Sequence, residues 1–163
     1  MKWPVALVIV SMTASVTATL DGFSGGHSHM SLEVHGAASD SIDVTVYKSP
    51  TCGCCKRWVD YMQRHGFRVV AKDTSDVGAV KSKLGVPANL HSCHTAVVGE
   101  YVVEGHVPVD VIQRLLSERP DIAGIAVAGM PAGSPGMETG GEADHYDVMS
   151  FGRDGTVQVY AKK

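Results

Sequence analysis

Three cysteines occur within four positions at the junction between a strand pattern and a helix pattern. The junction reads SPTCGCCKRW over residues 49–58 and contains Cys52, Cys54 and Cys55. Before it, residues 41–50 alternate apolar and polar side chains, which predicts a half-buried strand. After it, residues 51–66 carry apolar side chains at steps of three and four and end in glycine, which predicts a helix capped by Thr51. The chain must therefore fold so that three thiols share the first turn of a helix.

Strand and helix patterns continue to alternate after this junction. They predict a strand, a helix, two strands joined by a tight turn, and a last helix, over residues 67–73, 76–86, 94–105 and 107–120. The order strand, helix, strand, helix, strand, strand, helix, with cysteines after the first strand, is typical of a thioredoxin-like domain. We therefore expect an α/β fold with a thioredoxin-like core over residues 41–120.

The first 18 residues have the pattern of a secretory signal peptide. One early lysine precedes an apolar stretch over residues 5–10, and Val16 and Ala18 occupy the usual positions before a cleavage site. The apolar stretch is well short of the roughly 20 residues that span a bilayer. We predict a cleaved signal at 1–18, no stable membrane span in the mature protein, and a flexible tether rich in His, Gly and Ser at 19–40.

The segment after the core combines a loop pattern with a hairpin pattern. Residues 121–163 begin with a Gly- and Pro-rich stretch that contains Met130 and Met137, and they end with two alternating segments around Asp154-Gly155. We expect a methionine-containing loop and a C-terminal β-hairpin packed on the core. The formal charge of −3 lacks the basic excess that phosphate binding requires, so we expect no nucleic-acid partner.

The spacing of the three cysteines is compatible with thiol chemistry or with metal binding. A helix N-terminus stabilises thiolate over thiol, and Cys52 and Cys55 have the C-x-x-C spacing of thiol–disulfide exchange sites. Thiol–disulfide exchange needs only two thiols, so it leaves Cys54 without a role. Structural disulfides are also a poor explanation, because three crowded thiols cannot all form unstrained disulfides within the chain. Three alternatives stay open: an oxidoreductase with Cys52 as nucleophile and Cys55 as resolving thiol, a metal-binding protein, and a zinc- or disulfide-stabilised module without chemistry.

Cys93 is expected to join the three other thiols. In thioredoxin-like folds the segment before the third strand lies against the cysteine loop and normally carries a cis-proline, whereas here it reads CHT. Four converging thiolates suit Cu(I), Zn(II) or iron–sulfur clusters. Structural zinc usually uses two separate C-x-x-C pairs, and Cys54 and Cys55 point about a quarter-turn apart on a helix. A multinuclear, thiolate-bridged Cu(I) site therefore fits the spacing better than one zinc ion.

Two methionines and a histidine are further candidate ligands. Methionine thioethers are soft donors with little attraction for zinc, and Met130 and Met137 lie in the constrained loop GMPAGSPGME, with Met137 preferred. His106 leads into the last core helix, which starts near the cysteine loop in this fold. His94 follows Cys93 in an extended stretch, so we expect it to project to the opposite face.

Four motifs in register, CGCC, SCHTAVV, EGHVP and GMPAGSPGME, resemble the CopG-type family of exported copper-resistance proteins, long catalogued as a domain of unknown function. The likeness covers residues 41–138. It implies a thioredoxin-like periplasmic protein of copper homeostasis that holds a cysteine-bridged copper cluster, with redox cycling of copper and contact with periplasmic copper-export partners as further expectations. Carried over by position, the thiolate ligands are Cys52, Cys54, Cys55 and Cys93, with Met137, Met130 and His106 nearby.

Overall fold

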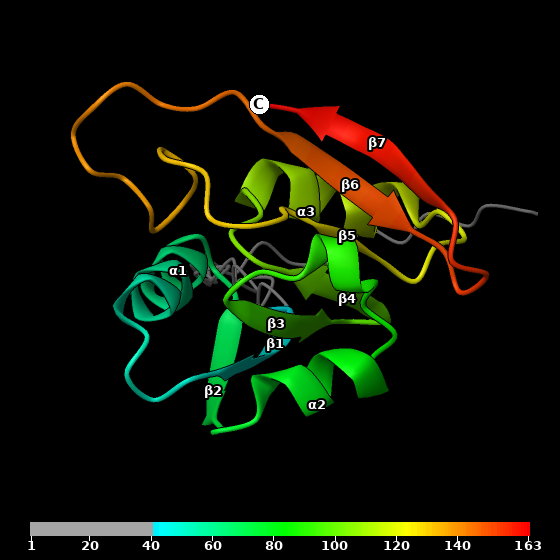
Figure 1. Ribbon diagram of the computed structural model, residues 1–163, viewed down its shortest axis with the longest axis horizontal. Helices are drawn as coiled ribbons and strands as arrows, with labels where there is room; N and C mark the ends of the chain where they lie inside the picture. Colours follow the sequence, from blue (N-terminus) through cyan, green and yellow to red (C-terminus); the bar gives the residue numbers. More distant parts are fainter. Residues whose placement is uncertain (1–40) are drawn as a thin grey trace, which may run out of the picture. The chain divides into compact units, whose positions relative to one another are not determined.

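A computed structural model describes residues 41–163, so the predicted signal peptide and tether lie outside the described residues. The described chain is a mixed α/β fold with three α-helices and a seven-stranded sheet (Figure 1). The strands are β1 (Asp43–Lys48), β2 (Arg68–Asp73), β3 (His94–Val98), β4 (Tyr101–Glu104), β5 (Gly124–Ala126), β6 (Asp147–Phe151) and β7 (Val157–Lys162). The helices are α1 (Gly53–Arg64), α2 (Val77–Lys83) and α3 (Val109–Glu118), and a short 3-10 helix covers Ala88–Leu90.

The sheet has the strand order β2-β1-β3-β4-β5-β6-β7. β1 and β2 are parallel, as are β4 and β5, and the other neighbouring pairs are antiparallel. The predicted order of strands and helices from β1 to α3 is confirmed. The predicted C-terminal hairpin is present as β6 and β7, and because β6 pairs with β5, the hairpin extends the main sheet.

Strand β5 lies in the segment that the sequence predicts as a loop. It has only three residues, too few to show a strand period, yet Ile125 and Ala126 are fully buried. A Cβ atom at Gly124 would clash with the carbonyl oxygen of Val102 on β4 and would lie 2.7 Å from the ring of Phe151 on β6. Glycine is needed here because the backbone of one neighbouring strand and an aromatic side chain of the other approach it closely.

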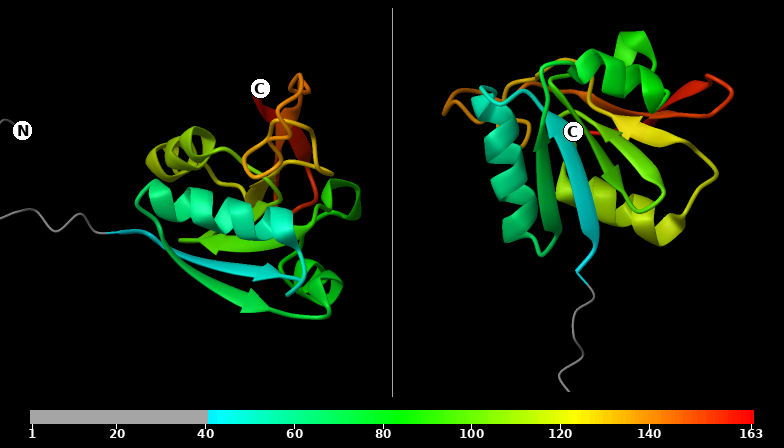
Figure 2. Two further views of the ribbon diagram at one scale, coloured as in Figure 1. Left: turned by 90° about the vertical axis from the view of Figure 1, so that its left-hand side faces the viewer. Right: turned by 90° about the horizontal axis from the view of Figure 1, so that it is seen from below.

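Helices cover both faces of the sheet, with α1 and α3 on one face and α2 on the other (Figure 2). Helix α1 packs its apolar side against β1 and β3, and this core includes Trp58, Met62, Val44, Val46 and Ala96. The strand residues share a face because successive side chains of a strand alternate. No helix within residues 41–163 is both long and apolar enough to cross a bilayer.

Helix α1 begins one residue later than the sequence indicates. Its N-cap is Cys52, whose side chain makes no capping hydrogen bond among the described residues, so the predicted cap by Thr51 is wrong. Thr51 Oγ1 instead lies 3.2 Å from Ser49 Oγ. The N–H groups of the first turn therefore lack a side-chain cap, and the positive end of the helix dipole lies at the cysteines.

Candidate metal centre

Four thiols from two distant parts of the chain meet at the start of α1. Cys52, Cys54 and Cys55 lie in or just before the first turn, and Cys93 lies in the bend that precedes β3. The four Sγ atoms lie within 4.8 Å of one another. Cys54 Sγ is 3.3 Å from Cys52 Sγ and 3.9 Å from Cys93 Sγ. The structure thus brings together all four cysteines that the sequence singles out, although their role as ligands stays a prediction.

Two of the four cysteines form a disulfide in this structure. Cys52 and Cys55 are bonded, with their Cα atoms 5.4 Å apart, while Cys54 and Cys93 are free and partly exposed. Cys55 is fully buried. The C-x-x-C pair is therefore oxidised here, and the disulfide must be reduced before all four sulfurs can act as thiolates.

His106 presents a ring nitrogen to Cys93. Its Nε2 is 2.9 Å from Cys93 Sγ, and its Nδ1 donates a hydrogen bond of 2.7 Å to the carbonyl oxygen of Pro135. Because a carbonyl can only accept, the His106 proton must be on Nδ1, which leaves the Nε2 lone pair facing the sulfur. Burial lowers the pKa of His106 below its usual value, so the ring is neutral. A metal-binding histidine commonly has this arrangement, in which the second nitrogen is held by a carbonyl.

His94 lies in the same cluster, so the expectation that it projects to the opposite face is wrong. Its ring centroid is 4.6 Å from that of Trp58 on α1 and 4.9 Å from that of His106. Its Nδ1 is 3.3 Å from Cys93 Sγ. Strand alternation begins at His94, but Cys93 belongs to the preceding bend, so the two side chains need not lie on opposite faces. Burial lowers the pKa of His94 well below its usual value and keeps this ring neutral as well.

The loop after β5 packs against the start of α1 (Figure 1). Arg57 Nε donates to the carbonyl oxygen of Gly136 at 2.8 Å. A Cβ atom at Gly136, whose φ is +86°, would lie 2.9 Å from both the Cys54 carbonyl oxygen and the Trp58 nitrogen. Only glycine permits this approach, which places the half-buried Met137 next to the helix end that carries the cysteines. Met130 is 53% exposed, and both methionines remain predicted ligands.

A buried ion pair holds the segment that carries Cys93. Glu104 on β4 is fully buried, and its Oε1 accepts from Lys81 Nζ at 2.5 Å and from the backbone N–H of Ser92 at 2.6 Å. Its Oε2 accepts from Thr95 Oγ1 at 2.6 Å, and Lys81 Nζ also donates to Thr95 Oγ1 at 3.0 Å. The Glu104 carboxylate therefore binds Ser92, directly before Cys93, and Thr95, two residues after it.

Sequence reasoning missed this ion pair and the position of His94. Glu104 ends a short apolar strand and Lys81 lies in a short helix, and charged side chains in such places are usually exposed. The sequence gives one signal, which is that Glu104 follows the apolar residues of a strand and Lys81 lies among the apolar positions of a helix. That pattern does not identify a partner.

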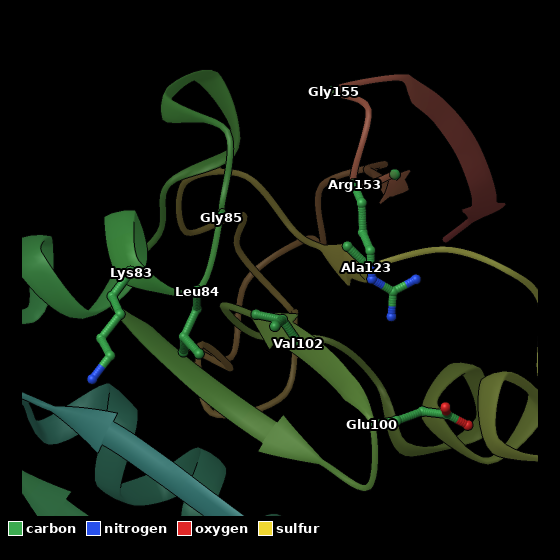
Figure 3. A pocket seen from close by; sticks show the side chains of 9 residues that line it. Lys83, Leu84, Gly85, Glu100, Val102, Ala123, Arg153 and Gly155 are labelled. Atoms are coloured by element: carbon green, nitrogen blue, oxygen red, sulfur yellow. The ribbon is translucent and has the colours of Figure 1, made fainter.

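A separate hollow of about 370 Å³ lies at the other end of the sheet and is lined by Leu84, Val102 and charged side chains (Figure 3). Cys93 lies before the first residue of β3, whereas Glu100 lies in the turn between β3 and β4 and Val102 near the start of β4, at the opposite end of this antiparallel pair. The hollow is thus remote from the thiols. Two of its charged groups have partners, since Glu100 pairs with Arg119 at 3.1 Å and Arg153 with Asp121 at 3.4 Å. The thiol cluster is the better candidate for function.

The pKa of the Cys93 thiol is raised to about 12, first because the group is partly buried and then because Cys54 lies beside it. At neutral pH Cys93 is therefore a thiol, and a metal ion that binds its sulfur must displace a proton. We expect the affinity of the reduced protein for a soft metal ion such as Cu(I) to rise with pH between about 6 and 8, by about tenfold per pH unit for each proton released. Competition with a Cu(I) chelator of known protonation measures this slope.

The matched control for this pH dependence is Cys93→Ser. In this variant the logarithm of the metal affinity should rise less steeply with pH, by about one proton released on binding, because one displaceable thiol proton is gone. An affinity that does not change with pH in the unmodified chain would contradict coordination by Cys93.

The fold and the site define a mixed α/β protein with a cluster of thiols and imidazoles suited to a soft metal ion. Residues 90–137 match the family described as "Protein of unknown function, DUF411". Among solved structures, "Copper resistance protein copG- Form 2" is 44% identical, with 76% of this chain and 99% of that chain covered and a TM-score of 0.73. "Copper resistance protein copG- Form 1" is also 44% identical, with 76% and 98% covered and a TM-score of 0.72.

The curated proteins contain no match to this chain. The identity and coverage of the solved structures are nevertheless decisive, and the chain belongs to the CopG family of copper-resistance proteins. The matched segment 90–137 contains Cys93, His94, Glu104 and His106, which lie in or support the cluster.

Proposed function

We propose that this protein binds copper in copper homeostasis, as a cysteine-bridged multinuclear Cu(I) site. The observation that carries the proposal is the meeting of Cys93 with the three thiols of α1, all within 4.8 Å. The printed names of the similar structures, which are copper-resistance proteins, support copper as the metal. The ligands would be Cys52, Cys54, Cys55 and Cys93, with His106, Met137 and Met130 as further donors.

The donor set favours Cu(I) over a single zinc ion. Thiolate, thioether and imidazole are all soft or intermediate ligands, and thiolates can bridge several Cu(I) ions. Cys54 and Cys55 are adjacent on α1, about a quarter-turn apart, which suits thiolates that bridge several ions better than one tetrahedral centre. His106 already has its second nitrogen bonded to Pro135, as a ligand requires.

We infer that residues 41–120 form a thioredoxin-like core and that residues 121–163 complete it. The strand order β2-β1-β3-β4, with β1 parallel to β2 and β3 antiparallel to both β1 and β4, supports this inference. Residues 41–163 contain no cis peptide bond, so the bend at Cys93 lacks the cis-proline expected of such folds. The motif CHT takes that place and contributes a ligand.

We further propose that the chain is exported to the periplasm by the signal at 1–18 and exchanges copper with export partners there. The C-x-x-C pair would also allow copper redox chemistry. Reduced Cys52 and Cys55 would transfer one electron to each of two Cu(II) ions, giving two Cu(I) ions, one disulfide and two protons. The disulfide in this structure corresponds to the product of that reaction.

Copper content should depend on the oxidation state of the Cys52–Cys55 pair. We expect the disulfide form to bind little Cu(I) at the cluster, because two of the four thiolates are absent, whereas the reduced form takes up several equivalents. Anaerobic copper analysis after desalting, with thiol titration of the same samples, checks this. Equal uptake by both forms would contradict the proposed cluster.

Metal analysis of protein isolated from copper-supplemented periplasm tests the proposal directly. Several copper ions per chain support the cluster. One zinc ion per chain would favour a stabilised module without chemistry instead.

A second candidate function is thiol–disulfide exchange on exported proteins, favoured by the Cys52–Cys55 disulfide at the start of α1. Replacing Cys54 with serine separates the two functions. Under the copper proposal Cys54→Ser lowers the copper content per chain, because a bridging thiolate is lost. Under the exchange proposal it leaves both copper content and insulin reduction within about twofold of the unmodified protein, because Cys54 is not part of the exchanging pair. Both assays on one preparation decide between them.

A further inference from the structure

The His94 ring is fully buried and only one of its nitrogens has a partner. Nδ1 lies 3.3 Å from Cys93 Sγ, while Nε2 has no hydrogen-bond partner among the described residues. The ring is held between Trp58 and His106, with centroid distances of 4.6 and 4.9 Å. Trp58 is itself fixed, because its Nε1 donates to the carbonyl oxygen of Val107 at 3.0 Å. The ring therefore has little freedom to turn Nε2 toward another partner.

The unpartnered nitrogen indicates which tautomer is present. A neutral imidazole carries its proton on one nitrogen, and a buried N–H without an acceptor costs more than a buried lone pair without a donor. The proton of His94 is therefore on Nδ1, where it faces the sulfur of Cys93. The Cys93 sulfur accepts from this N–H at 3.3 Å.

His106 faces the same sulfur as a hydrogen-bond acceptor, whereas His94 faces it as a donor. Its proton is on Nδ1 and bonded to Pro135, so the bare Nε2 at 2.9 Å accepts the S–H of Cys93. The hydrogen bonds thus run in one direction, from His94 through Cys93 and His106 to the Pro135 carbonyl. The proton between the Cys93 sulfur and His106 Nε2 must leave before both atoms can bind one metal ion.

We propose that His94 is a positioning residue that donates its Nδ1–H to the Cys93 sulfur, and that His106 alone supplies a nitrogen ligand to the metal. The inference rests on the proposed copper site. When Cu(I) binds, a copper–sulfur bond replaces the S–H bond, the proton leaves to solvent, and no electron is transferred. The hydrogen bond from His94 persists and holds the sulfur in place.

The tautomer can be measured in the metal-free protein, independently of copper. Ring-nitrogen NMR shifts distinguish a protonated from an unprotonated imidazole nitrogen. We expect protonated Nδ1 and bare Nε2 for both His94 and His106. A proton on His94 Nε2 would overturn the proposal. Because no metal is involved, this result stands whether or not the copper function holds.

Loading the reduced protein with a spin-active cadmium isotope then shows which histidine binds the metal and which one only donates a hydrogen bond. Cadmium is soft and does not oxidise thiols. We expect cadmium–nitrogen coupling at His106 Nε2 and none at His94. Coupling at His94 would make it a ligand and overturn the inference. Failure of cadmium and Cu(I) to bind at all would contradict the proposed function while leaving the tautomer result intact.

Two substitutions at His94 provide the matched comparison. His94→Phe keeps an aromatic ring beside Trp58 but removes the donor, and should weaken Cu(I) binding by about 10- to 100-fold. His94→Asn places an amide N–H near the position of Nδ1 and should recover most of that loss. An asparagine variant that is folded by circular dichroism yet binds no better than the phenylalanine variant would overturn the donor role.

Discussion

Replacing Glu104 with glutamine should lower the free energy of unfolding by about 3–5 kcal/mol. The change is nearly isosteric, but it leaves the buried Lys81 ammonium without its counter-charge, and the Lys81 side chain is only 6% exposed. Breaking a buried ion pair from one side is costly because the remaining charge stays desolvated. Glu104 also accepts from Thr95 and from the Ser92 N–H, so two further hydrogen bonds weaken.

Urea denaturation of the metal-free protein measures this effect. Glu118→Gln is the matched control, because Glu118 pairs with Arg114 at 3.4 Å on the half-exposed surface of α3 and should change stability by less than about 1 kcal/mol. A double variant, Lys81→Met with Glu104→Gln, removes the orphaned charge and should recover part of the loss. If Glu104→Gln and Glu118→Gln have equal effects, the buried pair does not stabilise the fold.

Replacing Cys93 with serine should weaken Cu(I) binding by at least about 100-fold and abolish the multinuclear site. A hydroxyl is a hard, protonated donor with little affinity for Cu(I), and Cys93 is the thiol that joins the cluster from the bend before β3. The remaining thiols all come from residues 52–55, so no thiolate is left to bridge ions from the bend before β3. Copper content per chain and Cu(I) competition, both under reductant, check the prediction.

Cys54→Ser is the comparison for this variant, because it also removes one sulfur but keeps the link between α1 and the bend before β3. We expect it to lose less copper than Cys93→Ser. Full copper content in the Cys93→Ser protein would show that copper binds to the helix thiols alone.

The sequence predicted most of the framework because its signals are local. Alternation in β1, the three- and four-residue steps of α1 and the glycine that follows it all arise from neighbouring residues. The hairpin of β6 and β7 was likewise signalled by its turn. Strand β5 was not predicted, because three residues show no period and its burial depends on Val103 and Phe151 of other strands.

Within the site, the thiols could be predicted and the groups that surround them could not. Cys93 was expected near the helix thiols from the order of elements, and the structure places it 3.9 Å from Cys54. His94 was misplaced, since alternation was extended backward to Cys93, which lies in a bend. Glu104 and Lys81 were overlooked, because a charged side chain looks exposed until its partner is known.

The sequence by itself determined which chemistry is available: three thiols at a helix start, a fourth before a strand, and the strand and helix periods that form the sheet. Only the tertiary structure decided how these groups are used, namely which histidine nitrogen faces Cys93, which carbonyl holds His106, and which buried carboxylate fixes the Cys93 bend. The physical reason is the separation along the chain over which each kind of interaction acts. Periodicity and capping act between residues a few positions apart, whereas hydrogen bonds such as those of Glu104 to Lys81 and of Arg57 to Gly136 join residues that only folding brings together.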